Sequence, residues 1–188
     1  LHKNTKFLEG GRMEIKRERY LNQLIQFKWD GMVKVITGIR RSGKSYLLNV
    51  LFRNYLKEQG VDEDHILFFA LDNDKYLRYR NPLELSAFVR GLVENNKEQY
   101  YLFVDEIQMS DAVDNPYNPN GKKVTFYDVL NGLNSLENLD IYVTGSNSKM
   151  LSSDIATEFR GRATQIRVYP FSFGEFYSYV GGDERKAL

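Results

Sequence analysis

The sequence predicts an α/β fold in which a parallel sheet is covered by helices on both faces. The main observation is that short apolar runs alternate with segments of helical spacing along the whole chain. Such alternation is typical of parallel sheets, whose strands are joined by helices that pack on the sheet. With 188 residues, of which 42% are hydrophobic and 27% charged, the chain has the size and composition of one compact domain.

Each element of this fold has its own local pattern. The apolar runs predict strands at 32–37 (MVKVIT), 65–71 (HILFFAL), 100–105 (YYLFVD), 140–145 (DIYVTG) and 163–170 (ATQIRVYP). Apolar residues at helical intervals predict helices at 17–27, 45–59, 82–96, 124–136 and 171–180, and one helix or a broken one at 148–159. Gly60 ends the second of these helices, and Pro82 occupies a first-turn position in the third.

One segment, 109–121 (MSDAVDNPYNPNG), breaks the alternation. Its Asn-Pro and Asn-Gly pairs oppose regular structure, so we expect an exposed loop just beyond the carboxyl end of a strand. In open α/β sheets, ligands bind at this edge.

Composition excludes several classes of protein. The formal net charge of +1 gives no global attraction to nucleic acid or to an anionic membrane. Without cysteine there is neither a disulfide framework nor a thiolate metal site, which fits a reducing, cytoplasmic location. No window is apolar enough for a membrane-spanning helix, and the first residues lack the apolar core of a signal peptide.

The stretch GIRRSGKS, residues 38–45, matches the phosphate-loop pattern G-x-x-x-x-G-K-[ST] between a predicted strand and a predicted helix. Gly38, Ser42 and Gly43 would let backbone N–H groups turn toward phosphate oxygens at the start of a helix. Lys44 would reach the terminal phosphates, and the Ser45 hydroxyl would bind Mg²⁺. The alternative is a glycine-rich turn that binds nothing.

Arg40 and Arg41 occupy the variable positions of this loop. They would add positive potential near the phosphates or contact a partner. The alternative is that both side chains face solvent.

The run YYLFVDEIQ supplies the acidic partner of the loop. Asp105 ends a buried strand, where its carboxylate would hold Mg²⁺ beside Ser45. Glu106 follows directly and would accept a proton from the attacking water as general base. The alternative is a strand followed by solvated acids.

A third polar group follows the strand IYVT. Because the carboxyl ends of parallel strands share one edge, Thr144 and Asn147 would emerge near Asp105. Either side chain would bind the γ-phosphate or position the water. Alternatively, this segment is a turn that caps a helix.

These three elements in this order resemble the AAA+ ATPases, within the additional-strand branch of the P-loop NTPases. More narrowly, GIRRSGKS, VDEIQ, VTGSNSKML, FRGR and YPFSFGEF resemble a bacterial and archaeal family of AAA-type ATPases that usually carry a further C-terminal domain of unassigned function. The resemblance covers residues 18–179. It implies a three-layer sandwich with a five-stranded parallel sheet and with the phosphate-loop strand near its centre.

The resemblance also implies an oligomer or a partner subunit in which an arginine completes a neighbour's site. Arg160 and Arg162 in EFRGR are the candidates for this contact with the γ-phosphate. The alternative for each is a surface position or a salt bridge within the chain. Two departures from the family are the length of the loop at 109–121 and the lack of a lid domain before Leu188.

We therefore expect residues 13–188 to form an AAA-type nucleotide-binding domain, the N-terminal part of a longer protein, and residues 1–12 to be a leader or vector-derived. The expected activity is Mg²⁺-dependent hydrolysis of ATP to ADP and phosphate, with Asn147 as sensor. A nucleotide-gated binding module with little turnover, acting on nucleic acid or an effector domain, is the alternative. A small-molecule kinase would need an arginine-rich lid, which the sequence lacks.

The stretch LDNDKYLRYR (71–80) would offer an aromatic, basic surface to single-stranded nucleic acid, or else pack as half-buried structure.

Overall fold

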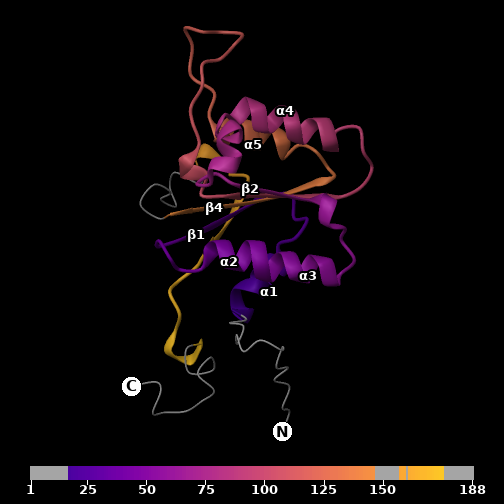
Figure 1. The fold of residues 1–188 in the computed structure, drawn as a ribbon, viewed down its shortest axis with the longest axis vertical. Helices are drawn as coiled ribbons and strands as arrows, with labels where there is room; N and C mark the ends of the chain where they lie inside the picture. Colours follow the sequence, from indigo (N-terminus) through magenta and orange to yellow (C-terminus); the bar gives the residue numbers. More distant parts are fainter. Residues whose placement is uncertain (1–16, 147–156, 160, 176–188) are drawn as a thin grey trace.

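A computed structural model describes residues 17–146, 157–159 and 161–175. A five-stranded sheet, parallel throughout, lies between two layers of helices (Figure 1). Helices α4 and α5 cover one face, and α1, α2 and α3 cover the other. The predicted α/β class, the three layers and the five parallel strands are therefore confirmed.

The strands are β1 (Val33–Gly38), β2 (Ile66–Ala70), β3 (Tyr100–Asp105), β4 (Leu139–Ser146) and β5 (Ala163–Arg167). Their order across the sheet is β2-β3-β4-β1-β5, so the strand that leads into the phosphate loop is an inner strand, as expected. The fifth strand ends earlier than the predicted segment 163–170. Its ladder nevertheless continues for one bond, because the Val168 N–H donates to the Thr37 carbonyl oxygen at 2.7 Å.

The helices are α1 (Glu18–Gln26), α2 (Lys44–Tyr46), α3 (Arg53–Glu58), α4 (Pro82–Val93) and α5 (Phe126–Leu133), with 3-10 turns η2 (Glu63–His65), η3 (Asp74–Arg80) and η4 (Ile107–Met109). The single helix predicted over 45–59 forms as α2, a π-helical segment η1 (Leu47–Phe52) and α3 in succession. Of the two helices predicted nearest the C-terminus, segments 148–156 and 176–180 lie outside the described residues. In the described parts, residues 157 and 158 are helical, and the helix predicted from 171 has helical backbone from 173.

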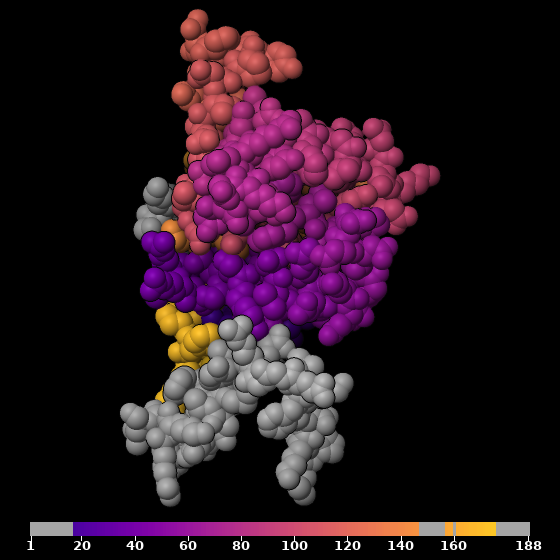
Figure 2. Space-filling model, viewed as in Figure 1, coloured from indigo at the N-terminus to yellow at the C-terminus, as the bar shows by residue number. Residues whose placement is uncertain are grey.

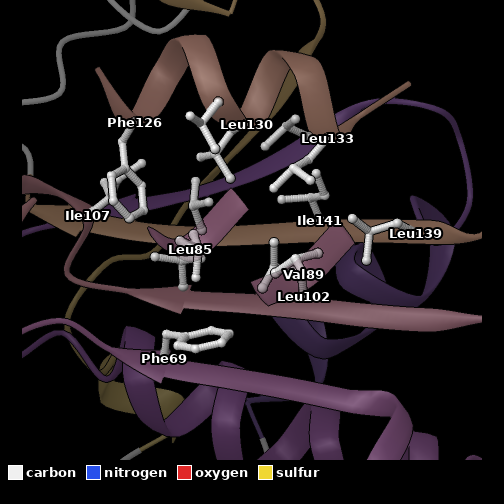
Figure 3. Close-up of a cluster of buried hydrophobic side chains, with 14 of the residues drawn as sticks. Phe69, Leu85, Val89, Leu102, Ile107, Phe126, Leu130, Leu133, Leu139 and Ile141 are labelled. Atoms are coloured by element: carbon white, nitrogen blue, oxygen red, sulfur yellow. The ribbon is translucent and has the colours of Figure 1, made fainter. Parts of the chain in front are cut away.

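The core has one apolar layer on each face of the sheet. Figure 3 shows the first, in which Phe126, Leu130 and Leu133 of α5 pack over Leu102 and Ile141. The second lies under α1 to α3, and its fully buried members include Leu24, Ile36, Phe52, Phe103 and Tyr142. Burying each such side chain contributes about 1.5–3 kcal/mol, which fixes the strand ends that carry the polar groups described below.

Residues 111–123 form an arm that projects beyond the carboxyl end of β3 (Figures 1 and 2). The prediction of an exposed loop here is confirmed, and Tyr117 in the arm is 95% exposed. One feature was not predicted. Val113 and Val124 exchange backbone hydrogen bonds of 3.0 and 2.8 Å and form an antiparallel bridge at the base of the arm.

The tyrosine rings of the stretch 71–80 pack against the sheet, while most of its other residues are exposed. The ring centroids of Tyr76 and Tyr79 lie 5.8 and 4.8 Å from that of Phe69. Arg78 pairs with Glu84 at 2.7 Å. These contacts favour the packing interpretation over a surface for single-stranded nucleic acid.

Candidate functional site

The loop 38–45 leaves β1 at the carboxyl edge of the sheet and turns directly into α2. Gly43 has φ 87° and ψ 20°, a left-handed conformation that glycine adopts without steric cost. Gly38 is required for a different reason. A Cβ added there would lie 2.3 Å from the carbonyl oxygen of Val168, so only glycine lets the loop start so close to the segment after β5.

Lys44 is 3% exposed, and its ammonium donates only to loop carbonyls, those of Gly38 at 3.2 Å and Ile39 at 3.1 Å. Among the described residues no carboxylate pairs with it. A buried ammonium whose charge no carboxylate balances favours an anionic ligand nearby. The Ser42 hydroxyl oxygen is also buried, without a hydrogen-bond partner in the described part of the chain.

Arg40 and Arg41 are both exposed, and Arg41 has a positive φ of 65°. Their exposure agrees with the solvent-facing alternative. A contact with phosphate or with a partner stays a prediction for both.

The acidic side of the site lies at the end of β3, next to the loop. Asp105 is 5% exposed, and its Oδ1 accepts a hydrogen bond of 3.1 Å from Ser45 Oγ. The Thr144 hydroxyl at the end of β4 donates to the same Oδ1. The Glu106 N–H in turn donates to Thr144 Oγ1 at 3.0 Å. The loop, Asp105, Glu106 and Thr144 are thus brought together by one chain of hydrogen bonds.

Burial raises the pKa of the Asp105 carboxyl, and the Thr144 and Ser45 hydroxyls oppose this by hydrogen-bonding the ionised form. The negative charge of Glu106 raises it further. No ammonium or guanidinium among the described residues pairs with Asp105. A cation bound at this position would favour the ionised form.

The donor set fits Mg²⁺. A hydroxyl oxygen and a carboxylate oxygen 3.1 Å apart are hard ligands of the kind this ion prefers, and Mg²⁺ usually takes its remaining ligands from water and phosphate. The described residues contain no group of three or more His, Cys, Asp or Glu side chains that would form a separate metal centre.

Glu106 has φ 56° and ψ 53°, a left-handed conformation that is strained for a residue other than glycine. Such strain costs on the order of 1–3 kcal/mol and clusters at functional sites. Gln108 Nε2 donates to Glu106 Oε2, so the carboxylate is also held by a side chain two residues further on. Gln108 lies in the run VDEIQ but was not predicted as a site residue.

The remaining predicted residues lie elsewhere. Arg162 is exposed and immediately precedes β5, at the amino edge of the sheet, where its carbonyl accepts from the Val33 N–H at 2.9 Å. This is the edge opposite the phosphate loop, so Arg162 does not approach the loop of its own chain. Asn147 and Arg160 lie outside the described residues, and their roles stay predictions.

A second residue that sequence reasoning missed is Arg17, whose guanidinium donates to the carbonyl oxygen of Ser42 in the loop. It stands in the charged run KRER, and such a run is normally a solvated face.

None of the helices in the described segments is long and apolar enough to cross a bilayer.

Comparison with protein families gives a match over residues 30–177 to a model described as an AAA domain. An uncharacterized protein of Haemophilus influenzae is 35% identical over 174 residues, which cover 93% of this chain and 40% of that protein. An uncharacterized protein of Methanocaldococcus jannaschii is 30% identical over 176 residues, covering 91% of this chain and 34% of that protein. The chain therefore spans well under half the length of either relative.

Several solved structures share the fold. The S. cerevisiae Hsp104:casein complex matches with a TM-score of 0.57 at 19% identity, covering 90% of this chain and 29% of that one. AMPPCP-bound DnaA from Aquifex aeolicus matches with a TM-score of 0.52 at 16% identity, covering 96% of this chain and 53% of that one. At these identities the likeness extends to the fold alone.

Proposed function

Because the chain belongs to the AAA domain family and is a nucleotide-binding module of the AAA+ type, we propose that it binds ATP with Mg²⁺ and hydrolyses it to ADP and phosphate. The observation that carries this proposal is the hydrogen-bond chain from Ser45 through Asp105 and Thr144 to the Glu106 backbone. It joins the phosphate loop to an acidic pair in which one carboxylate lacks a cationic partner among the described residues.

The backbone and the motif side chains of the loop have separate roles in binding. The backbone N–H groups between Gly38 and Ser45 bind phosphate oxygens at the start of α2. The Lys44 ammonium, which donates to carbonyl oxygens of the loop, binds the terminal phosphates instead when ATP is present. A hydrogen bond from an ammonium to a charged phosphate oxygen is stronger than one to a neutral carbonyl oxygen. Ser45 and Asp105 would hold Mg²⁺, which would neutralise charge on the phosphate oxygens.

Glu106 acts as general base. A water oxygen attacks the γ-phosphorus, its proton passes to the Glu106 carboxylate, and the bond to the ADP oxygen breaks. Thr144 contributes by position, because its hydroxyl contacts both Asp105 Oδ1 and the Glu106 N–H. We therefore assign Thr144 to the alignment of the two carboxylates rather than to direct contact with the γ-phosphate.

Exposed Arg162, at the edge opposite the loop, is suited to act on a neighbouring subunit. We propose that Arg162 or Arg160 completes the site of a second copy or of a partner subunit. In a mixing experiment, a Lys44→Ala subunit, inactive itself, then restores activity to an Arg162→Ala or Arg160→Ala subunit. Activity that is independent of protein concentration, with no rescue of either arginine variant, contradicts this assignment.

A second candidate function is a nucleotide-gated module with little turnover. It is favoured by the hydrogen bond from Gln108 to Glu106, which occupies one oxygen of the general base. Phosphate release under a many-fold excess of ATP separates the two functions, because a gated module stops after about one turnover.

The test of hydrolysis is Glu106→Gln in the intact protein. This change keeps size and hydrogen bonding but removes the basic carboxylate, so ATP affinity is retained while phosphate release falls by about 10²- to 10⁴-fold. Glu137→Gln, an exposed glutamate at the amino edge of the sheet, is the matched control and leaves both quantities unchanged. Wild-type turnover by Glu106→Gln would mean that Glu106 is not the base.

A further inference from the structure

Arg17 is a charged residue that the fold buries completely. It immediately precedes α1, and its side chain has 0% exposure. Its backbone is left-handed, with φ 43° and ψ 42°, a conformation that costs about 1–2 kcal/mol for a residue with a side chain. Burial of a charge together with an unfavourable backbone indicates that specific contacts hold this side chain in position.

Three of those contacts join separate parts of the chain. Nη1 donates to the carbonyl oxygen of Ser42 in the phosphate loop, and Nη2 donates to the carbonyl oxygen of Tyr169 at 2.5 Å. Nε donates to Glu175 Oε1 at 3.2 Å, forming an ion pair. We call these four residues the Arg17 clasp. A planar guanidinium presents its donors in a fixed fork, so the clasp sets the loop and segment 169–175 in one arrangement.

Aromatic rings complete the enclosure of this cation. The guanidinium carbon lies 4.7 Å from the ring centroid of Tyr20 and 4.9 Å from that of Phe171. Tyr20 belongs to α1 and Phe171 to the segment after β5, so the rings hold the guanidinium between α1 and the segment that its hydrogen bonds also reach. Cation–π contacts are stronger for a desolvated cation such as this one.

The bond to Ser42 also has a consequence for the loop. In a planar trans peptide the C=O and N–H groups point in opposite directions. Because the Ser42 carbonyl points at Arg17, the N–H of Gly43 in the same peptide points away from Arg17. The glycine at 43 leaves room for this arrangement, since an added Cβ would lie 3.3 Å from Arg17 Nη1.

We propose that Arg17 is a positioning residue that aims the Gly43 N–H at bound phosphate and couples occupancy of the phosphate loop to segment 168–175. The inference rests on the proposed function, because it requires phosphate in the loop. A phosphate that accepts from the Gly43 N–H polarises that peptide and makes the Ser42 carbonyl a better acceptor for Arg17. The coupling is reciprocal, so loosening the clasp at Glu175 weakens phosphate binding.

The first measurement is the affinity for Mg·ATP, by calorimetry on the intact protein. Arg17→Met is expected to weaken binding by about tenfold to a hundredfold, the usual size of a coupling free energy between two sites. Arg17→Lys retains the charge and one contact, so its loss of affinity is smaller. Arg19→Met removes an exposed arginine from α1, two residues after Arg17. It is the matched control and is expected to bind Mg·ATP as the unchanged protein does.

Because Arg17→Met also removes packing, Glu175→Gln provides a milder test at the far end of the clasp. Its carboxylate is 25% exposed, and the change keeps its size. We expect a weaker affinity for Mg·ATP, by a smaller factor than in Arg17→Met. A merely structural role would lower the melting temperature of either variant without changing the affinity.

Two signals report the coupling itself. In the unchanged protein, Mg·ATP moves the Gly43 amide proton resonance and slows hydrogen exchange across segment 168–175. In folded Arg17→Met and Glu175→Gln protein, saturated with nucleotide, both responses are reduced. Equal responses in all variants, or equal affinities, overturn the proposal.

The proposal and the proposed function fail in different ways. If the unchanged protein binds no ATP, both are wrong. If it binds ATP and Glu106→Gln blocks hydrolysis, while the Arg17 and Glu175 variants bind normally, only the coupling is wrong.

Discussion

The α1–α3 face of the sheet carries two polar clusters built around buried charges, one at each edge. The amino-edge cluster consists of Asp30, Lys34, Asp140 and Tyr142, and the carboxyl-edge cluster consists of Lys44, Ser45, Asp105, Glu106 and Thr144. Strand β4 contributes to both, because residues 140, 142 and 144 alternate onto the same face. The comparison is informative because each cluster contains a buried lysine and a buried aspartate.

In the amino-edge cluster the opposite charges meet. The Lys34 ammonium, 0% exposed, contacts Asp140 Oδ1 directly and Asp30 Oδ1 at 3.0 Å. Asp140 Oδ2 accepts from the Tyr142 hydroxyl at 2.8 Å and from the Trp29 N–H at 3.0 Å. Burial raises the pKa of Asp140, and the Lys34 ammonium opposes that shift. Both carboxylates of this cluster contact the Lys34 ammonium, so the opposite charges are paired within the chain.

In the carboxyl-edge cluster the charges stay apart. Lys44 binds carbonyl oxygens, and Asp105 accepts only from hydroxyls among the described contacts. The same two residue types therefore serve structure where they pair with each other. Where the lysine and the aspartate lack charged partners, as Lys44 and Asp105 do among the described residues, they are suited to bind an anionic ligand together with its metal cation.

The largest expected contrast is between the two lysines. Lys34→Met leaves Asp140 buried without its cation, so the free energy of unfolding falls by about 3–5 kcal/mol. Lys44→Met leaves no carboxylate unpaired, so stability changes by less than about 1 kcal/mol while ATP affinity is lost. Chemical denaturation and calorimetry measure the two quantities. A comparable loss of stability in Lys44→Met would remove the distinction between the clusters.

The two aspartates should respond to substitution with opposite signs in nucleotide-free protein. The folded-state pKa of Asp105 is raised by burial, so its ionisation costs stability as pH rises from about 4 through the folded value. Asp105→Asn removes that cost and raises the free energy of unfolding at pH 7. Burial raises the pKa of Asp140 too, but Asp140→Asn lowers the free energy of unfolding, because it leaves the buried Lys34 ammonium without its closest anion and that cost outweighs the relief of burial.

Denaturation at several pH values gives the check. The difference in stability between Asp105→Asn and the unchanged protein should shrink toward acidic pH, where the carboxyl is protonated in both states. A difference independent of pH would show that Asp105 is not a destabilising buried carboxylate.

The smallest contrast lies within β4. Tyr142→Phe and Thr144→Val each remove one buried hydroxyl and should each lower the free energy of unfolding by about 1 kcal/mol. Only Thr144→Val disturbs the alignment of Asp105 and Glu106, so only it lowers the rate of ATP hydrolysis, by about tenfold to a hundredfold. Equal hydrolysis by the two variants would indicate that Thr144 has no positioning role.

The carboxyl-edge cluster was largely predictable because its residues follow local patterns. Ser45 belongs to a motif with fixed spacing, and Asp105 ends a continuous apolar run. Their proximity follows from parallel strands that share one edge, and the hydrogen bond between Ser45 and Asp105 confirms it. The family resemblance placed the phosphate-loop strand near the centre of the sheet. The order of the other strands was not predicted, since periodicity does not specify which strands pair.

The amino-edge cluster and the Arg17 clasp were not predicted. Lys34 and Asp140 are separated by 106 positions, and each stands in a strand where an alternating apolar pattern gives no indication of a charged partner. Arg17 lies in a charged run that is normally solvated, and its contacts with Ser42 and Tyr169 come from distant segments. The strained backbone of Glu106 depends on tertiary hydrogen bonds that sequence patterns do not report.

The most direct test of the central claim, that the carboxyl-edge cluster binds Mg·ATP, is calorimetric titration of the intact protein with ATP in the presence and absence of Mg²⁺. We predict a single site per chain that binds more tightly with Mg²⁺, and a loss of that Mg²⁺ effect in Asp105→Asn with binding of ATP itself retained. An ATP affinity that does not depend on Mg²⁺ in the unchanged protein, or an undiminished Mg²⁺ effect in Asp105→Asn, would contradict the account.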